Sequence, residues 1–336
     1  MVAVVVFAVV ATAVLLWSKW WPYAGKAHTA LVKHTWSAPS VLDTAGRAGD
    51  GPSLQGGWDF TVAYGKSVWK AWVAGLILAA AASALIRRDW LLRALGRGRG
   101  PGGGAAAGGI AGMVTLMCTA CAAPVTASLR RDGVRSSATL GFLYANPVLN
   151  PAVLIILAAV APWQWVATRI VLGLVLVFVL AAVVERLSGE RPTPAPEVVE
   201  VEPARAAESF LRRLVLLAVT LTPLYVVLTL LEGTFRGWIL PLDGSTTIEV
   251  AVLVAIVLGT IVDVPTTGEV PIVLSLAAAG MGAPVVGALL LTLPAISFGT
   301  MVLIRTAHGI RTTALAGVAV AVTGIGGALL LPLLGG

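Results

Sequence analysis

The two cysteines of this 336-residue chain have the most distinctive chemistry, and both lie in one apolar tract. Cys118 and Cys121 stand three residues apart in CTACAAP, which ends at Pro124. Thiols at this spacing can bind a soft metal or metalloid, or they can exchange disulfides as a redox pair. A third interpretation is that each cysteine is a small apolar filler. A structural disulfide is not expected from so short a separation inside an apolar segment.

Two acidic residues flank a second interruption, VPTTGEVP, at Asp263 and Glu269. A carboxylate inside a membrane segment is costly, so we predict that both couple transport to protons. The alternative is that Glu269 caps a half-helix beginning at Pro271. We expect Glu269 to be isolated, because Arg169, the nearest cation in a predicted span, should lie toward the outer surface.

Hydroxyl and amide side chains at the interruptions complete the predicted site. Asn146 and Asn150 flank Pro147 in YANPVLNP, where they either bind carbonyls freed by the proline or contact the substrate. The predicted substrate-binding residues are Cys118, Thr119, Cys121, Asn146, Asn150, Thr266, Thr267 and Glu269. Cys118 and Cys121 are also the predicted ligands for a soft metal or metalloid.

The composition places these residues in a membrane protein. Hydrophobic residues make up 58% of the chain and charged residues 12%, and the mean hydropathy is +0.92. No soluble domain buries so much apolar surface, so we predict an all-α polytopic membrane protein in contact with lipids. The net charge of +7 reflects arginines in loops, and neither nucleic acid binding nor a cofactor is expected.

Apolar stretches define the predicted spans. The uninterrupted spans are 2–17, 67–86, 137–160, 164–186, 211–231, 283–304 and 312–334. Gly, Pro and polar residues interrupt two further tracts, 103–129 and 247–279. The first span lacks a basic N-terminal region and a small-residue cleavage site, so we expect a retained anchor helix.

Landmark residues recur 147 positions apart, which predicts an internal repeat. The matched pairs include Gly112 with Gly259, Thr119 with Thr266, Pro124 with Pro271, Gly133 with Gly280, and Pro147 with Pro294. The predicted organisation is an anchor helix with an extracytoplasmic loop (1–59), a first repeat (60–187), a flexible cytoplasmic linker (188–206) and a second repeat (207–334).

The arginine distribution favours inverted repeats. Each half has three spans and one interrupted tract. If the interrupted tract enters and leaves the membrane on the same side, each half crosses the membrane three times, and the second half is inverted. That arrangement places the Arg-rich loops and the linker in the cytoplasm, the N-terminus inside and the C-terminus outside. Broken helices at matching positions of inverted halves indicate a transport site near the midplane. We expect Pro124 and Pro271 to be the first residues of the half-helices.

The stretch CTACAAPVTASLRRDGVRSSATLGFLYANPVLNPAVL resembles the first signature of a bacterial predicted-permease family. That family includes the trivalent organoarsenical efflux permeases. GAPVVGALLLTLPAISFGTMVLIR is similar to its second signature, and the likeness covers roughly 67–310, closest to an uncharacterised branch. Family members usually carry Cys-x-Cys before the proline; Cys118 keeps the first position, Ala120 occupies the second, and Cys121 is displaced by one.

The resemblance implies a secondary permease of the plasma membrane that exports a small thiophilic solute, a trivalent metalloid or organometalloid. The chain lacks the G-x-x-x-x-G-K-[ST] motif, so ATP-driven pumping is not expected. One alternative is a transporter of a soft divalent metal or a sulfur compound. Another is an intramembrane thiol oxidoreductase that uses Cys118 and Cys121. We predict a transporter and not an enzyme, and leave open a homo-oligomer or an accessory subunit.

Overall fold

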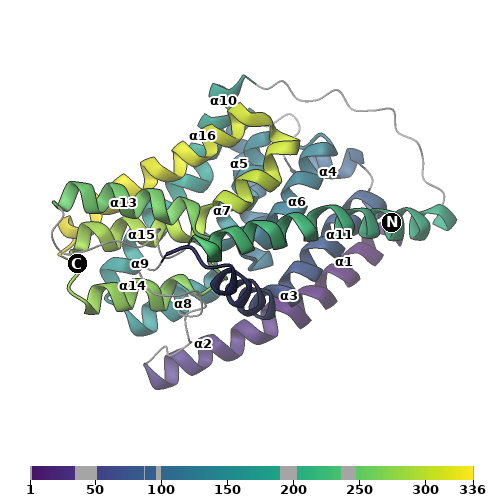
Figure 1. The fold of residues 1–336 in the computed structure, drawn as a ribbon. Helices are drawn as coiled ribbons and strands as arrows, with labels where there is room; N and C mark the ends of the chain where they lie inside the picture. The colour runs from purple at the N-terminus through teal and green to yellow at the C-terminus, as the bar shows by residue number, and fades with distance from the viewer. Residues whose placement is uncertain are drawn as a thin grey trace.

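The structure is a computed structural model, and in the residues it describes every regular element is a helix (Figure 1). Those residues are 2–34, 51–86, 88–95, 100–189, 203–235 and 247–335. The helices are α1 (Val2–Leu15), π-helical η1 (Leu16–Trp20), α2 (Trp21–Lys33), α3 (Leu54–Leu85), α4 (Arg88–Ala94), α5 (Gly100–Thr115), α6 (Thr119–Arg131), α7 (Ser136–Val148), α8 (Pro151–Val160), α9 (Trp163–Leu174), π-helical η3 (Val175–Leu180), α10 (Ala181–Ser188), α11 (Pro203–Thr234), α13 (Ile248–Ile261), α14 (Glu269–Ala278), α15 (Ala283–Ala295) and α16 (Phe298–Leu333). Most of the predicted linker, 190–202, and residues 35–50 of the predicted loop lie outside the described residues.

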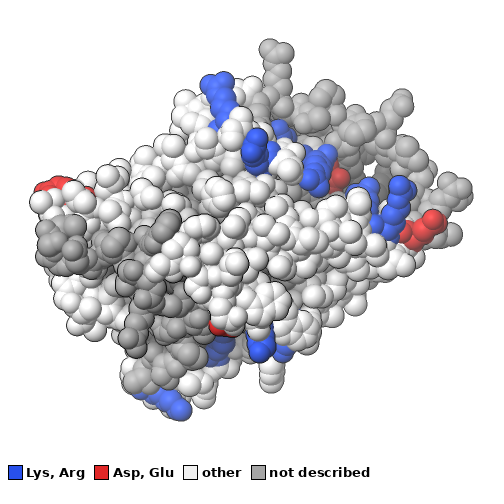
Figure 2. All heavy atoms as spheres, viewed as in Figure 1, with Lys and Arg blue, Asp and Glu red and all other residues white. Residues whose placement is uncertain are grey.

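Among the described residues, six helical stretches are long and apolar enough to cross a membrane. They are Val4–Lys33, Leu54–Leu85, Ser136–Val160, Trp163–Ser188, Ala207–Thr234 and Phe298–Leu333. Large apolar side chains such as Val219, Leu253 and Leu329 are widely exposed on the helices, as contact with lipid requires. Figure 2 shows a broad uncharged band across this face, with Lys and Arg gathered at its upper and lower borders. The prediction of an all-α polytopic membrane protein is confirmed.

Helix bounds recur at the spacing of the sequence repeat. α7 begins at Ser136 and α15 at Ala283, 147 residues later, and the two helices have equal lengths. α6 and α14 each end in a left-handed glycine, Gly133 (φ 90°) and Gly280 (φ 89°), a conformation that glycine adopts without strain. The inverted orientation of the halves stays a prediction, although the first turn of α1 and the last turn of α16 lie at opposite ends of the molecule (Figure 1).

The predicted span 137–160 is divided into α7 and α8, and 283–304 into α15 and the start of α16. The divisions follow Pro147 and Pro294, and new helices begin after the caps Asn150 and Ser297. The predicted span 137–160 remains one stretch long enough to cross a membrane, Ser136–Val160, and it is broken at its proline as expected. A proline supplies no backbone donor, and the cap side chains start the next helix. α16 in turn bends at Gly309 (φ 73°, ψ 165°), which lies between its part of 283–304 and the predicted span 312–334.

The half-helices begin earlier than expected. α6 begins at Thr119, so Pro124 lies inside it, and α14 begins at Glu269, so Pro271 is its third residue. The prediction that each proline starts its half-helix is wrong. In the first half the reason is local: the side chain of Cys118, six residues before Pro124, caps α6 and lets the helix begin at Thr119.

The N-terminal segment is longer than the predicted span 2–17. α1, η1 and α2 follow without interruption from Val2 to Lys33. The π-helical turn η1 ends two residues before Pro22, which has no backbone donor for a regular helical hydrogen bond. This extension carries polar side chains of η1 and α2 to the second interruption.

Candidate functional site

The first interruption, between α5 and α6, is stabilised by Asn146. Leu116 has a left-handed backbone (φ 53°) where α5 ends. Asn146 Oδ1 accepts hydrogen bonds from the Thr115 hydroxyl and from the Met117 backbone N–H (2.9 Å), and its Nδ2 donates to the Phe142 carbonyl (2.8 Å). The Asn146 side chain therefore satisfies polar groups that the break exposes, as buried backbone requires.

The two cysteines form the start of α6. Cys118 is the N-cap, and its Sγ accepts a hydrogen bond from the Cys121 backbone N–H (3.3 Å). The two sulfurs are paired as a disulfide with Cα atoms 5.3 Å apart, and both residues are buried, as is Thr119 between them. The expectation against a disulfide is wrong, because the first helical turn brings residues three apart onto one face. In the thiol form the same placement would present two sulfurs to one soft atom.

Asn150 begins α8 in the same way. Its Oδ1 accepts hydrogen bonds from the backbone N–H groups of Ala152 (3.0 Å) and Val153 (3.4 Å). Its Nδ2 has no hydrogen-bond partner among the described residues. Asn150 is thus a helix cap with one free donor, whereas Ser297, 147 residues later, caps α16 through Thr300 N (3.1 Å).

The second interruption, between α13 and α14, is reached by the N-terminal segment. The ammonium of Lys19, on η1, donates to Thr266 Oγ1 (3.3 Å), and the Tyr23 hydroxyl donates to the Thr266 carbonyl (3.2 Å). Thr267 beside them has a left-handed backbone (φ 75°), which is strained for a β-branched residue. The segment predicted only as an anchor therefore contributes two polar side chains to the predicted site.

Glu269 has a cationic partner. Arg169 Nη2 lies 2.8 Å from Glu269 Oε1, and the guanidinium also donates to the carbonyls of Pro147 (2.8 Å) and Val148 (3.0 Å). The expectation that Glu269 is isolated is wrong, because the fully buried Arg169 reaches it. The physical reason is that α7 ends at Val148, so its last carbonyls need donors that only a side chain can supply here.

Asp263 opens the second interruption beside three side chains of the long helices. Its backbone N–H donates to Glu232 Oε1 of α11 (2.9 Å). Its carboxylate interacts electrostatically with Tyr64 of α3 and Tyr225 of α11. The side chains of Asp263, Tyr64 and Tyr225 are all buried.

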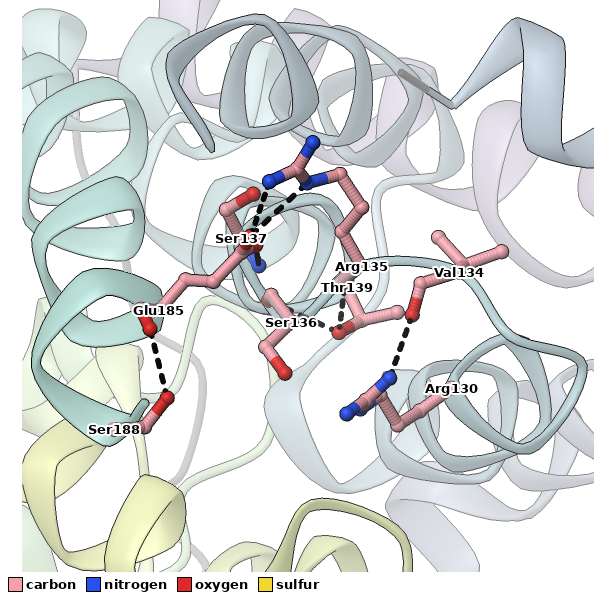
Figure 3. A network of polar contacts seen from close by, with 8 residues as sticks. All are labelled: Arg130, Val134, Arg135, Ser136, Ser137, Thr139, Glu185 and Ser188. Atoms are coloured by element: carbon pink, nitrogen blue, oxygen red, sulfur yellow. Dashed lines mark hydrogen bonds and ion pairs between the residues drawn. The ribbon is translucent and has the colours of Figure 1, made fainter. Parts of the chain in front are cut away.

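A cavity and a polar network lie at the end of α6 opposite the cysteines. The cavity has a volume of about 540 Å³ and is lined by Ser83 of α3, Ser128 and Arg131 of α6, and Arg212 and Arg213 of α11, among others. Beside it, the α6–α7 connection is held to α10. Arg135 Nε donates to Glu185 Oε1 (3.0 Å), and Glu185 Oε2 accepts from Ser137 N (2.8 Å), as Figure 3 shows.

The predicted site residues thus form two groups. Cys118, Thr119, Cys121 and Asn146 lie at the first interruption, with Asn150 at the nearby break between α7 and α8, and Asp263, Thr266, Thr267 and Glu269 form the second. Arg169 links the groups, because it binds carbonyls between Asn146 and Asn150 as well as Glu269. In the described part of the chain no three His, Cys, Asp or Glu residues gather as a metal site.

Comparison with known proteins identifies the family. A family model described as predicted permease matches residues 54–330. This chain belongs to the predicted-permease family. It is 38% identical over 332 residues to the UPF0718 protein YraQ of Escherichia coli strain K12. The aligned residues make up 97% of this chain and 94% of YraQ. No solved structure matches the chain. The family and the membrane helices make the chain a multi-pass membrane permease.

The sequence did not indicate a site role for Lys19, Tyr64, Tyr225 and Glu232, nor the pairing of Arg169 with Glu269. Lys19 and Arg169 had a usable signal, since each is a lone cation within an apolar stretch, and such residues usually face the protein interior. The two tyrosines gave no such sequence signal, because a tyrosine in a membrane span more often lies at the membrane–water interface. Their role depends on which helices are neighbours.

Proposed function

We propose that this permease is a secondary transporter that exports a small thiophilic solute, a trivalent metalloid or organometalloid, across the plasma membrane. The observation that supports it is the placement of Cys118 and Cys121 at the start of a broken helix, buried and within reach of each other. Thiolates select soft ions, and a buried pair would replace the water or thiol ligands of such a solute.

The hydroxyl groups near the two interruptions could bind a solute that exchanges its own ligands for protein ligands as it crosses the membrane. Broken helices expose unpaired backbone groups only where protein or a solute pathway satisfies them. Thr119 next to the cysteines, and Thr266 and Thr267 at the second break, supply hydroxyls for oxygen ligands of the solute. The cavity between α3, α6 and α11 would admit the solute from the predicted cytoplasmic side.

Transport into everted membrane vesicles tests the proposal. Vesicles containing the permease should accumulate a trivalent organoarsenical faster than vesicles without it, and excess monothiol should compete. Soft divalent metals and sulfur oxyanions form parallel arms, because a transporter of those solutes is the first alternative. Equal accumulation with and without the protein in every arm would remove the transport proposal.

A second candidate, an intramembrane thiol oxidoreductase, is favoured by one observation. The sulfurs of Cys118 and Cys121 are paired, and Cys118 sits at a helix N-terminus, which stabilises a thiolate. Thiol trapping separates the two functions. An oxidoreductase would cycle between disulfide and dithiol when a quinone or dithiol partner is supplied, whereas a permease would bind solute as the dithiol without turnover.

A further inference from the structure

Three buried polar atoms without hydrogen-bond partners meet where α3, α11 and the second interruption come together. They are Asp263 Oδ1 and the hydroxyl oxygens of Tyr64 and Tyr225; none makes a hydrogen bond of ordinary geometry to a described residue, although the three groups and Ser297 lie near enough to interact. The residues are 2%, 0% and 6% exposed. One unsatisfied buried polar atom costs about 1–3 kcal/mol, so three at one place point to a species that binds them.

The helices hold the tyrosines firmly in this position. Tyr225 stacks on Trp72 of α3, with ring centroids 4.5 Å apart and planes 16° apart, and Trp72 Nε1 is fixed by Thr222 Oγ1 (3.1 Å). The rings of Tyr64 and Tyr225 are themselves 5.9 Å apart. Aromatic packing between α3 and α11 therefore places the two hydroxyls close to each other and to Asp263.

Oxygen atoms surround the Asp263 carboxylate in the described part of the chain. α3 presents Tyr64, α11 presents Tyr225 and Glu232, and the cap of α16 presents the hydroxyl of Ser297. Within the described ranges no Lys, Arg or His pairs with the Asp263 carboxylate. By contrast Glu269, in the next helix, is paired with Arg169. A bare carboxylate in a membrane interior needs a cation, and here the protein supplies only oxygen atoms.

We propose that Asp263, Tyr64 and Tyr225 form the binding site for the coupling cation, a small monovalent ion that oxygen atoms ligate, namely a proton or sodium. Either ion neutralises the carboxylate; sodium could be ligated by both phenol oxygens, whereas a proton on Asp263 could be donated to one of them. The site lies at an interruption of α13–α14, where a bound ion can alter how the broken helices pack. The coupling role rests on the proposed function, whereas cation binding does not.

Cation binding is tested on the purified protein without any solute. Melting temperatures are compared in sodium chloride and choline chloride of equal ionic strength, at pH 6 and pH 8. Sodium binding raises the melting temperature in sodium chloride by about 3 °C or more, and proton binding raises it to a similar extent on acidification in either salt. Asp263→Asn should abolish whichever shift the unmutated protein shows. Equal salt and pH responses in the two proteins would overturn the proposal.

Tyr225→Phe and Tyr64→Phe sharpen the test, because removing an unpartnered hydroxyl should not impair folding. Both should reduce the cation-dependent shift. Tyr144→Phe is the matched control, since Tyr144 is also fully buried but donates to the Ala316 carbonyl (3.1 Å). It should leave the shift unchanged. A loss of the shift in the control equal to that in Tyr225→Phe would contradict the assignment.

A flux measurement separates coupling from transport. In proteoliposomes Asp263→Asn should retain solute exchange at equilibrium but lose accumulation against a gradient. Failure of the unmutated protein to move any thiophilic solute would reject the proposed function, while the melting shifts would still decide cation binding. Accumulation by Asp263→Asn equal to that of the unmutated protein would reject the coupling role.

Discussion

Arg169 Nη2 and Glu269 Oε1 lie 2.8 Å apart, and the pair joins residues 100 positions apart on opposite sides of the predicted repeat boundary. Arg169 is fully buried and Glu269 nearly so. The guanidinium also holds the last carbonyls of α7, so one side chain connects the end of α7 with the start of α14. Arg169 Nη1 has no partner in the described part of the chain, which leaves one donor available at this junction.

Removing one member of this pair should destabilise the protein strongly. Arg169→Met leaves the Glu269 carboxylate without its cation and frees two carbonyls, which should cost about 3–5 kcal/mol. Glu269→Met should cost a similar amount, and the double variant should recover part of the loss. Unfolding in detergent, measured for all four proteins, gives the coupling energy. Additive effects of the two substitutions would show that the pair contributes nothing as a pair.

The ion pair also changes what Glu269→Gln is expected to do. A proton carrier at Glu269 would lose its titration in this variant, so binding would survive and accumulation would fail. A structural partner of Arg169 would instead lose stability, because a neutral amide compensates the guanidinium poorly. We predict the second outcome: lower protein level and a pH profile of flux that matches the unmutated protein. A flattened pH profile at normal protein level would restore Glu269 as the proton carrier.

Cys118→Ser should abolish transport and leave the fold intact. A serine hydroxyl can cap α6 as the Cys118 sulfur does, but it cannot bind a soft atom. Cys121→Ser should have the smaller effect on transport, since Cys121 is displaced from the family position. Resistance of a metalloid-sensitive host and the protein level in its membranes are the measurements. If Cys118→Ser conferred full resistance, the cysteines would serve only as small apolar packing residues.

Much of the architecture could be predicted because Gly and Pro act locally. The break at Pro147, the left-handed glycines Gly133 and Gly280, and the spacing of 147 residues each depend on a few neighbouring positions. What failed depended on distant partners. Nothing near Glu269 in the sequence indicates Arg169, and nothing near Thr266 indicates Lys19. The start of α6 was misplaced because a cysteine cap is a rarer signal than a proline.

Gly75→Ala should impair transport through the position of Cys121. A Cβ at Gly75, on α3, would collide with the backbone carbonyl of Cys121, so α6 must move away. Gly65→Ala on the same helix is the matched control, because a Cβ there meets nothing within 4 Å. Flux should fall in the first variant only, with both proteins folded. Equal flux in the two variants would show that α6 tolerates the shift.

The predicted inverted topology would place the linker and the C-terminus on opposite sides of the membrane. A reporter active only in the cytoplasm should therefore be active when inserted in 190–200 and inactive when fused after Gly336. A periplasmic reporter should give the reverse pattern. The reason is that an odd number of crossings inverts the second half, and the Arg-rich loops then stay inside. Activity of the same reporter at both positions would contradict inversion.

Lys19→Met should reduce transport without reducing stability. The Lys19 ammonium is buried, contacts the Tyr23 ring (5.1 Å to its centroid) and donates to Thr266, while no carboxylate pairs with it among the described residues. A buried charge without a counter-ion is costly, so methionine, which keeps the apolar stem, should be tolerated or stabilising. The second interruption would lose a charged hydrogen bond worth about 1.5–3 kcal/mol, and flux should fall roughly ten- to hundredfold if that bond orders Thr266 during transport.

Lys33→Met, at the exposed end of α2, is the control and should transport normally. Unchanged flux in Lys19→Met would show that Lys19 does not contribute to transport and that the N-terminal segment serves only as a membrane anchor.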